Sequence, residues 1–177
     1  VGEAQVQQAV RLAAQSLAQL GAAWVLEVSH MGYLFGLFDA LGVPENARPG
    51  LLEKLREKNA HELRRAAQAA GLDAAGAAAL TGLLELSGSC EETLAKAERA
   101  CRNDRMRAAA AELRALAKTL EASGGAVRLD LSLAGEMEYY NGLVFQGYLQ
   151  GLPRPLLKGG RYDLLMQKFT PGAGAIG

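Results

Sequence analysis

Residues 129–169 read LDLSLAGEMEYYNGLVFQGYLQGLPRPLLKGGRYDLLMQKF, and this stretch holds two motifs that point to a binding site. The first runs from Glu138 to Gly142 (EYYNG), and we expect it on a strand. The second runs from Gly159 to Asp163 (GGRYD), at a turn from a strand into a helix. Each motif places tyrosine and a carboxylate beside glycine, a composition typical of a pocket for a small polar ligand.

Strand geometry indicates which side chains of the first motif could share a pocket. Because side chains alternate between the two faces of a strand, Glu138, Tyr140 and Gly142 are predicted to face one way, with about 7 Å between the first two. In the second motif, Gly159 and Gly160 permit a close approach by a ligand or a strand. Taken singly, each motif also fits a plainer interpretation, since paired tyrosines favour strands and paired glycines favour turns. The prediction of a site therefore depends on the two motifs together.

The elements around these motifs predict an α+β domain with an antiparallel sheet, because strands flank a block of helices. Val127, Leu129 and Leu131 alternate with polar residues, which indicates a half-buried strand ahead of a turn or bulge at Gly135. The elements expected after it are a long strand at 137–149, an antiparallel neighbour at 156–159, a short helix at 162–169 with Leu164, Leu165 and Phe169 facing inward, and the start of a strand at 172–177.

The first 45 residues are predicted to fold as helix, strand and helix. Apolar residues recur at helical spacing between Val6 and Leu20, and Gly21 supplies a C-terminal stop. A β-prone run (AWVLEV) occupies 23–28, and helical spacing returns over 31–41.

From residue 46 to 123 the sequence predicts a succession of helices, which we interpret as a helical insertion. Pro49 and Asp73 mark helix starts, and Ser89 with Glu92 fits a capping box. The last helix carries an apolar stripe formed by Met106, Ala109, Leu113, Leu116 and Leu120.

Two features invite a functional interpretation that the residues do not support. Ser29 and His30 are neighbours and no third group is suggested to orient them, so a helix-start serine and a structural histidine are favoured over a catalytic pair. Arg102, Arg105 and Arg107 are interleaved with acidic residues, which is more typical of a solvated, salt-bridged helix face than of an RNA-binding surface.

Length and composition bound the class of protein. The 177 residues suffice for one domain with an insertion, and Lys+Arg and Asp+Glu are both 19, so no net charge favours nucleic acid or a membrane. No apolar run approaches the roughly 18 residues of a membrane span, and no signal peptide is visible, so we expect a cytoplasmic protein. The chain begins and ends in mid-pattern, which indicates a piece of a longer protein. The predicted segments are a helix–strand–helix part (1–45), the helical insertion (46–123) and the antiparallel strands with the two motifs (124–177).

The cysteines and histidines suggest no metal site. Cys90, Cys101, His30 and His61 are the only residues of these types, and their spacings match no zinc motif. Two cysteines do not make a disulfide framework either, so both are interpreted as free thiols in a reducing compartment. We expect no metal and no cofactor.

The two motifs resemble the histidine-specific motifs of class II histidyl-tRNA synthetases. In that family the first motif is Arg-Gly-Leu-Asp-Tyr-Tyr-Thr-Gly followed by Val-Phe-Glu, and the second is Gly-Gly-Arg-Tyr-Asp. Here the first stands as residues 135–142 (GEMEYYNG) followed by Leu143-Val144-Phe145-Gln146, and the second is matched residue for residue at 159–163. A helical insertion before the first motif is also a family feature. The resemblance implies a class II synthetase-like sheet, present here as a partial domain.

One departure from the synthetase motif bears on chemistry. The synthetases have an arginine where this sequence has Gly135, and that arginine compensates charge on the ATP α-phosphate as the histidine carboxylate attacks it. Glycine offers no charge, and Glu136 beside it would oppose a polyphosphate. The pattern therefore resembles more closely the paralogous family that serves as regulatory subunit of ATP phosphoribosyltransferase in histidine biosynthesis, which has no aminoacylation activity.

This resemblance implies a histidine site, a partner and no catalytic residue. Tyr140 and Tyr162 are expected to reach the imidazole of bound L-histidine, with Glu138 on the same strand face. The further expected site residues are Tyr139, Gly159, Gly160 and Arg161. Arg161 and Asp163 are interpreted either as a mutually paired scaffold or as ligand contacts. The family's dimer-forming motif and its two arginine motifs have no identifiable counterpart in the sequence. The expected partners are the short-form catalytic subunit and a second copy of the chain in a hetero-oligomer.

Three alternatives stay open at this point. The chain could belong to a true histidyl-tRNA synthetase with a degenerate motif, although its balanced charge argues against a tRNA partner. It could be an interaction module whose tyrosines only pack the sheet. Glu136 and Glu138 could also form an acid–base pair for hydrolysis, but same-face spacing alone does not supply the second, opposed group which that chemistry requires.

Overall fold

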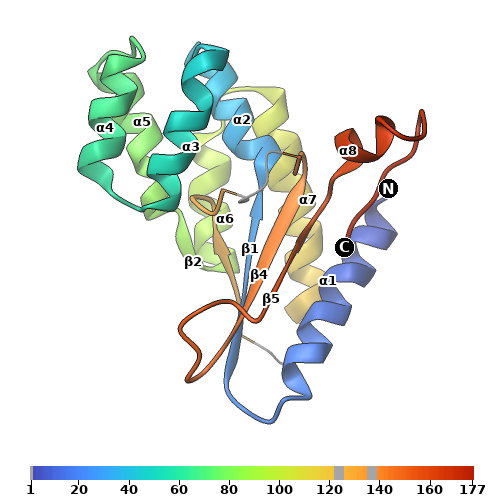
Figure 1. Cartoon of the computed structure of the whole chain (residues 1–177). Helices are drawn as coiled ribbons and strands as arrows, with labels where there is room; N and C mark the ends of the chain where they lie inside the picture. The colour runs from blue at the N-terminus through green and yellow to red at the C-terminus, as the bar shows by residue number, and fades with distance from the viewer. Residues whose placement is uncertain (1, 122–125, 135–138) are drawn as a thin grey trace.

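The computed structural model describes residues 2–121, 126–134 and 139–177, and their strands form a five-stranded sheet in the order β2-β3-β1-β4-β5. Helices α3, α4 and α5 gather at one end, while α1 and α7 lie along the sheet (Figure 1). In chain order the elements are α1 (Glu3–Ala18), β1 (Trp24–His30), α2 (Met31–Ala40), η1 (Glu45–Ala47), α3 (Arg48–Arg56), α4 (Ala60–Ala69), α5 (Ala74–Thr81), η2 (Gly82–Glu85), β2 (Ser87–Ser89), α6 (Cys90–Ala100), α7 (Asp104–Glu121), β3 (Ala126–Asp130), β4 (Leu143–Leu149), β5 (Leu157–Gly160) and α8 (Asp163–Gln167).

The sheet is mixed, whereas the sequence predicted an antiparallel one. Strand β1 pairs antiparallel with β4 but parallel with β3, and the other neighbours are antiparallel. A parallel pair needs a long crossover connection, and here the chain between β1 and β3 supplies it with helices α2 to α7. The α+β class is confirmed, with one parallel pair at the centre of the sheet.

Alternation along the strands gives the sheet two different faces. The helix-covered face carries apolar side chains such as Leu26, Val28, Leu129 and Phe145, all buried. Gly147 lies on the same face, where a Cβ atom would come within 2.7 Å of Leu17 on α1. The open face carries polar side chains, and pairing places one residue from each strand in a single row across it: Ser89, Arg128, Glu27, Gln146 and Lys158.

Helices α1 and α7 cover the apolar face with the residues that their sequences predicted. Val10 and Leu17 of α1 are fully buried, and so is the predicted apolar stripe of α7, which comprises Met106, Ala109, Leu113, Leu116 and Leu120. Leu20 is different, because α1 ends at Ala18 and the Leu20 side chain is 51% exposed. The helical period was therefore right, but it was extended one turn too far.

The range predicted as a run of helices, 46–123, also contributes to the sheet. Strand β2 lies inside this range and forms the edge beside β3, with Gly88 at a φ of +136°. A strand of three residues has too little alternation to be seen in a sequence. The predicted start of α3 at Pro49 and the Asp73 cap of α5 are confirmed, the latter by a 2.7 Å bond from the Gly76 N–H. The Ser89 side chain makes no capping bond to α6, so the predicted capping box is wrong.

The strand expected over 137–149 is shorter in the structure. Residues 135–138 lie outside the described part, so the turn or bulge predicted at Gly135 stays untested. Tyr139 to Asn141 are described and are not in a strand; β4 begins only at Leu143. The Met31 N–H still donates to Gly142 O (2.8 Å), in register with the β1–β4 pairing, whereas the Asn141 N–H donates to Arg161 O (3.1 Å), which departs from the β4–β5 register.

Near the C-terminus, two side chains predicted to face inward are exposed. Strand β5 confirms the predicted antiparallel neighbour of β4, but α8 is a short helix with Leu164 56% exposed, and Phe169 beyond its end is 75% exposed. The inward direction predicted for these two side chains is wrong, since five residues cannot maintain a helical stripe. The strand expected at 172–177 is reduced to one bridge between Arg161 and Ile176. Within the described ranges, no helix has the length and apolar character that a membrane span requires.

Candidate functional site

Three tyrosines from the two sequence motifs meet at one end of the sheet. The ring centroids of Tyr139 and Tyr140 lie 4.9 Å apart, and the Tyr162 ring lies 5.9 Å and 6.4 Å from them. Adjacent residues of a regular strand would point to opposite faces, so the alternation predicted for Tyr139 and Tyr140 is wrong. The departure from strand geometry before Leu143 brings both rings to the same side. We call these three half-buried residues the tyrosine cluster.

Gly160 forms the wall behind this cluster. A Cβ atom at Gly160 would lie 2.7 Å from Cδ1 of Tyr140 and 2.8 Å from the carbonyl oxygen of Leu143, so only glycine lets the ring approach the strand. Gly159 is paired with Phe145 and therefore belongs to the helix-covered face, where a Cβ would lie 2.3 Å from Cζ of Phe145. The two predicted site glycines thus serve opposite faces of β5.

Arg161 and Asp163 form a scaffold that ties the second motif to the first. The Arg161 Nε donates to Oδ2 of Asp163 at 2.5 Å, while Oδ1 of Asp163 accepts from the Ala175 N–H at 3.0 Å. The Asp163 N–H in turn donates to Oδ1 of Asn141 at 3.1 Å. Of the two interpretations of Arg161 and Asp163, these bonds favour mutual pairing. The ion pair, with Asn141, holds Tyr162 against the residues that precede β4.

Two expected features of the site lie outside the described residues. Glu138, the carboxylate of the first motif, and Gly135, the position at which the synthetases have arginine, both fall in 135–138. Among the described residues expected at the site, the structure brings together Tyr139, Tyr140, Tyr162 and Gly160 on the open face.

The sequence favours a structural role for His30, and the structure gives this buried side chain, at the same end of the sheet, a definite role. His30 is the N-cap of α2, where Nδ1 accepts from the Gly32 N–H at 3.0 Å. Because Nδ1 is an acceptor there, Nε2 carries the proton and donates to Oε2 of Glu112 at 3.1 Å. This bond, assisted by the positive charge of Arg161, lowers the pKa of Glu112. The predicted helix-start serine is replaced in this role by the histidine itself.

Glu112 connects α7 to the second motif and was not identified from the sequence. It lies 82 residues from His30, and no local pattern links the two. By alternation, Arg161 continues the helix-covered face of β5, on the side where α7 lies, which agrees with its electrostatic effect on Glu112. Arg161 thus points toward the side of Glu112 and α7, whereas Tyr162 points to the opposite side, where the other two tyrosines lie.

A second polar group that sequence reasoning missed joins α3 to the sheet. Lys58 has a left-handed backbone (φ +52°), and its Nζ lies 2.5 Å from Oδ2 of the buried Asp130. Oδ1 of Asp130 accepts from the N–H and hydroxyl of Ser132, at 3.0 Å and 2.6 Å. Burial, and then the charge of Asp130, raise the pKa of Glu27 on the open face nearby. The group fixes β3 and its following turn.

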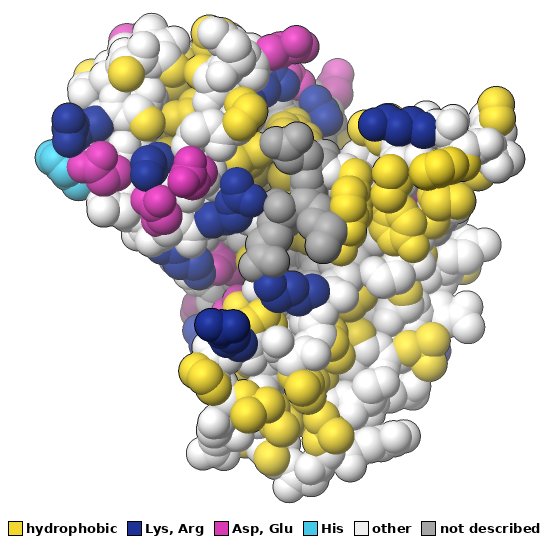
Figure 2. Space-filling view, viewed as in Figure 1, with side chains coloured by type: hydrophobic (Ala, Val, Ile, Leu, Met, Phe, Trp, Pro, Cys, Tyr) yellow, Lys and Arg dark blue, Asp and Glu magenta, His cyan; other side chains and the backbone are white. Residues whose placement is uncertain are grey.

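The surface around these groups carries two hydrophobic areas with positively charged side chains between them. Figure 2 shows hydrophobic side chains over α8 and the neighbouring end of β5, and again over the loop that joins β4 and β5. Lys and Arg side chains lie between these two areas (Figure 2). In the described ranges, no three His, Cys, Asp or Glu side chains are placed to hold a metal ion.

Comparisons with known proteins agree on one family. The family model described as histidyl-tRNA synthetase matches residues 2–177. The ATP phosphoribosyltransferase regulatory subunit of Shouchella clausii is 41% identical over 150 residues, which cover 82% of this chain and 37% of that protein. The chain thus spans about two fifths of the length of the curated relatives that it matches.

Solved structures show the same similarity in three dimensions. A protein from Bacillus halodurans, described as an ATP phosphoribosyltransferase regulatory subunit/histidyl-tRNA synthetase, superposes with a TM-score of 0.87 at 31% identity, covering 98% of this chain and 46% of that one. A chain of the ATP phosphoribosyl transferase (HisG:HisZ) complex from Thermotoga maritima has a TM-score of 0.72 at 18% identity, covering 91% and 57%. The latter likeness concerns the fold alone.

Proposed function

Because the chain belongs to the histidyl-tRNA synthetase family, we propose that it is part of a non-catalytic regulatory subunit of ATP phosphoribosyltransferase that binds L-histidine. The observation that carries the proposal is the tyrosine cluster against Gly160, combined with glycine instead of arginine at position 135. The names of curated relatives that cover most of this chain support it.

The chemistry of the cluster suits an imidazole ring. Imidazole presents one donor and one acceptor nitrogen, and a phenol can both donate and accept. We infer that Tyr140 and Tyr162 contact the two nitrogens, with Tyr139 packed against both rings. A ligand without these nitrogens would forgo both hydrogen bonds, which would favour histidine over other amino acids.

The other expected site residues receive different proposed roles. Glu138 stays a proposed contact. Gly159 and Arg161 are proposed to support the site from the helix-covered face. Gly159 lies against Phe145, whereas Arg161 pairs with Asp163 and its charge acts on Glu112. The segment 46–123 is proposed to act as an insertion whose last two helices also support the sheet.

The first test is calorimetric titration of the full-length protein with L-histidine. We expect Tyr140→Phe and Tyr162→Phe each to weaken binding roughly 5- to 100-fold, the equivalent of one lost hydrogen bond. Tyr148→Phe is the matched control, because its hydroxyl bonds to Gln146 (2.8 Å) at the other end of the open face. No histidine binding by the intact protein, or equal effects of all three variants, would contradict the proposed site.

A second test separates regulation from synthetase chemistry. In ATP–pyrophosphate exchange with L-histidine, we expect no turnover by the full-length protein, because Gly135 offers no charge to the α-phosphate. Histidine-dependent exchange followed by charging of tRNA would instead identify a histidyl-tRNA synthetase, the description of the matching family model.

The proposed partner is the short-form catalytic subunit of ATP phosphoribosyltransferase, with the chain present as a dimer in a hetero-oligomer. The complex of such proteins solved from Thermotoga maritima, one chain of which shares this fold, supports the idea. Light scattering after mixing the full-length protein with that catalytic subunit should show a complex larger than either component. Two unchanged components at micromolar concentrations would argue against this partner.

A further inference from the structure

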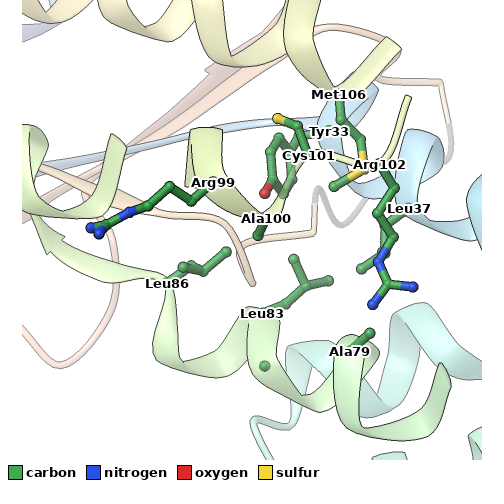
Figure 3. Close-up of a pocket in the computed structure, with 11 residues that line it drawn as sticks. Tyr33, Leu37, Ala79, Leu83, Leu86, Arg99, Ala100, Cys101, Arg102 and Met106 are labelled. Atoms are coloured by element: carbon green, nitrogen blue, oxygen red, sulfur yellow. The ribbon is translucent and has the colours of Figure 1, made fainter. Parts of the chain in front are cut away.

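A hollow of about 370 Å³ lies in the helical half of the molecule and contains none of the residues proposed for histidine (Figure 3). Helix α2, the α5–η2 segment and the connection from α6 to α7 enclose it. Its volume is within the range of small-molecule sites, near the lower limit. The residues that line it are Tyr33, Leu37, Ala79, Gly82, Leu83, Leu86, Arg99, Ala100, Cys101, Arg102 and Met106.

The walls of the hollow offer an occupant almost no hydrogen bonds. Leu37, Leu83 and Met106 are apolar and almost entirely buried. The Tyr33 hydroxyl already donates to Ala97 O at 2.8 Å, and the Cys101 thiol donates to the same carbonyl oxygen at 3.3 Å. An occupant must therefore have an apolar body, since the polar wall atoms have partners.

The exception is Arg102 at the rim. Among the described residues, no carboxylate pairs with Arg102, although Arg105 is 2.7 Å from Asp39 and Arg107 is 2.7 Å from Asp104. In Figure 3 the Arg102 guanidinium lies near Leu37 and Ala79, whereas Arg99 extends away on the opposite side. A guanidinium presents paired N–H groups that match a carboxylate. The rim thus supplies a cationic group next to an apolar interior.

From this arrangement we propose that the hollow binds a small carboxylate with an aryl or branched-alkyl body, with the carboxylate on Arg102 and the body against Ala79 and Leu86, which are apolar lining residues that are only half-buried. This site is separate from the histidine site and does not depend on it. It would be a second ligand site on the same chain, built from the helical segment.

The test uses three probes on the full-length protein: phenylacetate, phenylacetamide and acetate. Phenylacetate combines the apolar body and the anion, phenylacetamide keeps only the body, and acetate keeps only the charge. By calorimetry we expect phenylacetate to bind at least tenfold more tightly than either of the others. Equal affinity for phenylacetate and phenylacetamide, or no binding of phenylacetate, overturns the proposal.

Three variants locate the binding. Arg102→Gln should lower phenylacetate affinity at least tenfold, to the level of phenylacetamide, while Arg65→Gln removes a charge from α4 outside the hollow and should change nothing. Ala79→Leu, at a helical position on the wall, should weaken both aryl probes by filling space. An unchanged affinity in Arg102→Gln contradicts the assigned contact.

Cys101 lies in the wall and reports occupancy directly. Phenylacetate should slow alkylation of Cys101 by iodoacetamide severalfold in the wild-type protein. Cys90, which is also half-buried but does not line this hollow, should react at the same rate with and without the probe. Equal protection of both cysteines, or of neither, would place phenylacetate elsewhere.

Discussion

The two faces of the sheet are built from the same strands but have different roles. One face is packed against helices and stabilises the fold, and the other is open to ligands. On the helix-covered face, side chains such as Leu26 and Phe145 are packed by α1 and α7. On the open face, Glu27 stands between Arg128 and Gln146 in a polar row. Because side chains alternate between the two faces of a strand, neighbouring residues differ in role: one side chain packs in the core and the next is open to ligands. The comparison predicts opposite responses to substitution at neighbouring positions.

The largest contrast is expected between Leu26 and Glu27. Leu26→Ala should lower the free energy of unfolding of the full-length protein by about 2–5 kcal/mol, because it leaves a cavity beneath α1 and α7. Glu27→Gln should change it by less than about 1 kcal/mol. Urea unfolding measures both. Comparable losses at the two positions would mean that the open face is covered in the whole protein.

The paired glycines of β5 provide a second test of the difference between the two faces. Gly159→Ala and Gly160→Ala should each cost about 1–3 kcal/mol of stability, because the added methyl group overlaps Phe145 in one case and Tyr140 in the other. Only Gly160→Ala should also weaken L-histidine binding, since only Gly160 contacts the tyrosine cluster. The binding measurement on the folded variants distinguishes them; a matching loss of affinity in Gly159→Ala would refute the assignment of Gly159 to the other face.

A smaller effect is expected where α3 is joined to the sheet. Lys58→Met removes the ammonium from the buried Asp130 carboxylate and should cost roughly 1–2 kcal/mol, as Ser132 still provides two donors. Lys54→Met is the control, because its ion pair with Glu57 is on the surface and should have no measurable influence. Thermal unfolding compares the two; if both variants melt like the wild-type protein, the Lys58–Asp130 pair contributes nothing to stability.

The smallest predicted effects concern pH and have opposite signs on the two faces. The pKa of Glu112 is lowered by folding, so its contribution to stability is present above the unfolded value near 4.5 and is lost as the pH falls below it. The pKa of Glu27 is raised, so ionised Glu27 opposes folding above that range and the penalty disappears on acidification.

Glutamine variants test these signs. At neutral pH, Glu112→Gln should be slightly less stable than the wild-type protein and Glu27→Gln slightly more stable, each by less than about 1 kcal/mol since both groups are partly exposed. On acidification the Glu27→Gln difference should shrink first, before the pH reaches about 4.5, whereas the Glu112→Gln difference should persist to about pH 4.5 and shrink below it. The same sign for the two variants at neutral pH would overturn the electrostatic distinction between the faces.

Sequence patterns predicted those parts of the molecule whose signals are local. The helical period located α1, α2 and α7, the β-prone run located β1, and the GGRYD motif located the junction of β5 and α8. The pairing of Arg161 with Asp163 was among the interpretations, because oppositely charged residues two apart on an extended segment can meet. The proximity of Tyr140 and Tyr162 was implied by the resemblance rather than by spacing.

What the sequence did not predict depends on contacts between distant segments. The parallel pairing of β1 with β3 and the His30–Glu112 bond each join residues that are far apart in the chain. The divergence of Tyr139 and Tyr140 from a strand accompanies the bond from Asn141 to Arg161, a contact with another segment that overrides strand propensity. Lys58 at positive φ is stabilised by Asp130, 72 residues away.

The short strand β2 has a consequence for how copies of this protein meet. A sheet edge with unpaired N–H and carbonyl groups invites another chain to add a strand and so to aggregate. Here the edge beside β3 is three residues long, and Gly88 at its centre has a φ of +136°, far from extended geometry. An added strand would find few aligned partners at this edge. Self-association by continuation of the sheet is thereby discouraged on this side, and subunits that approach it must be recognised through their side chains.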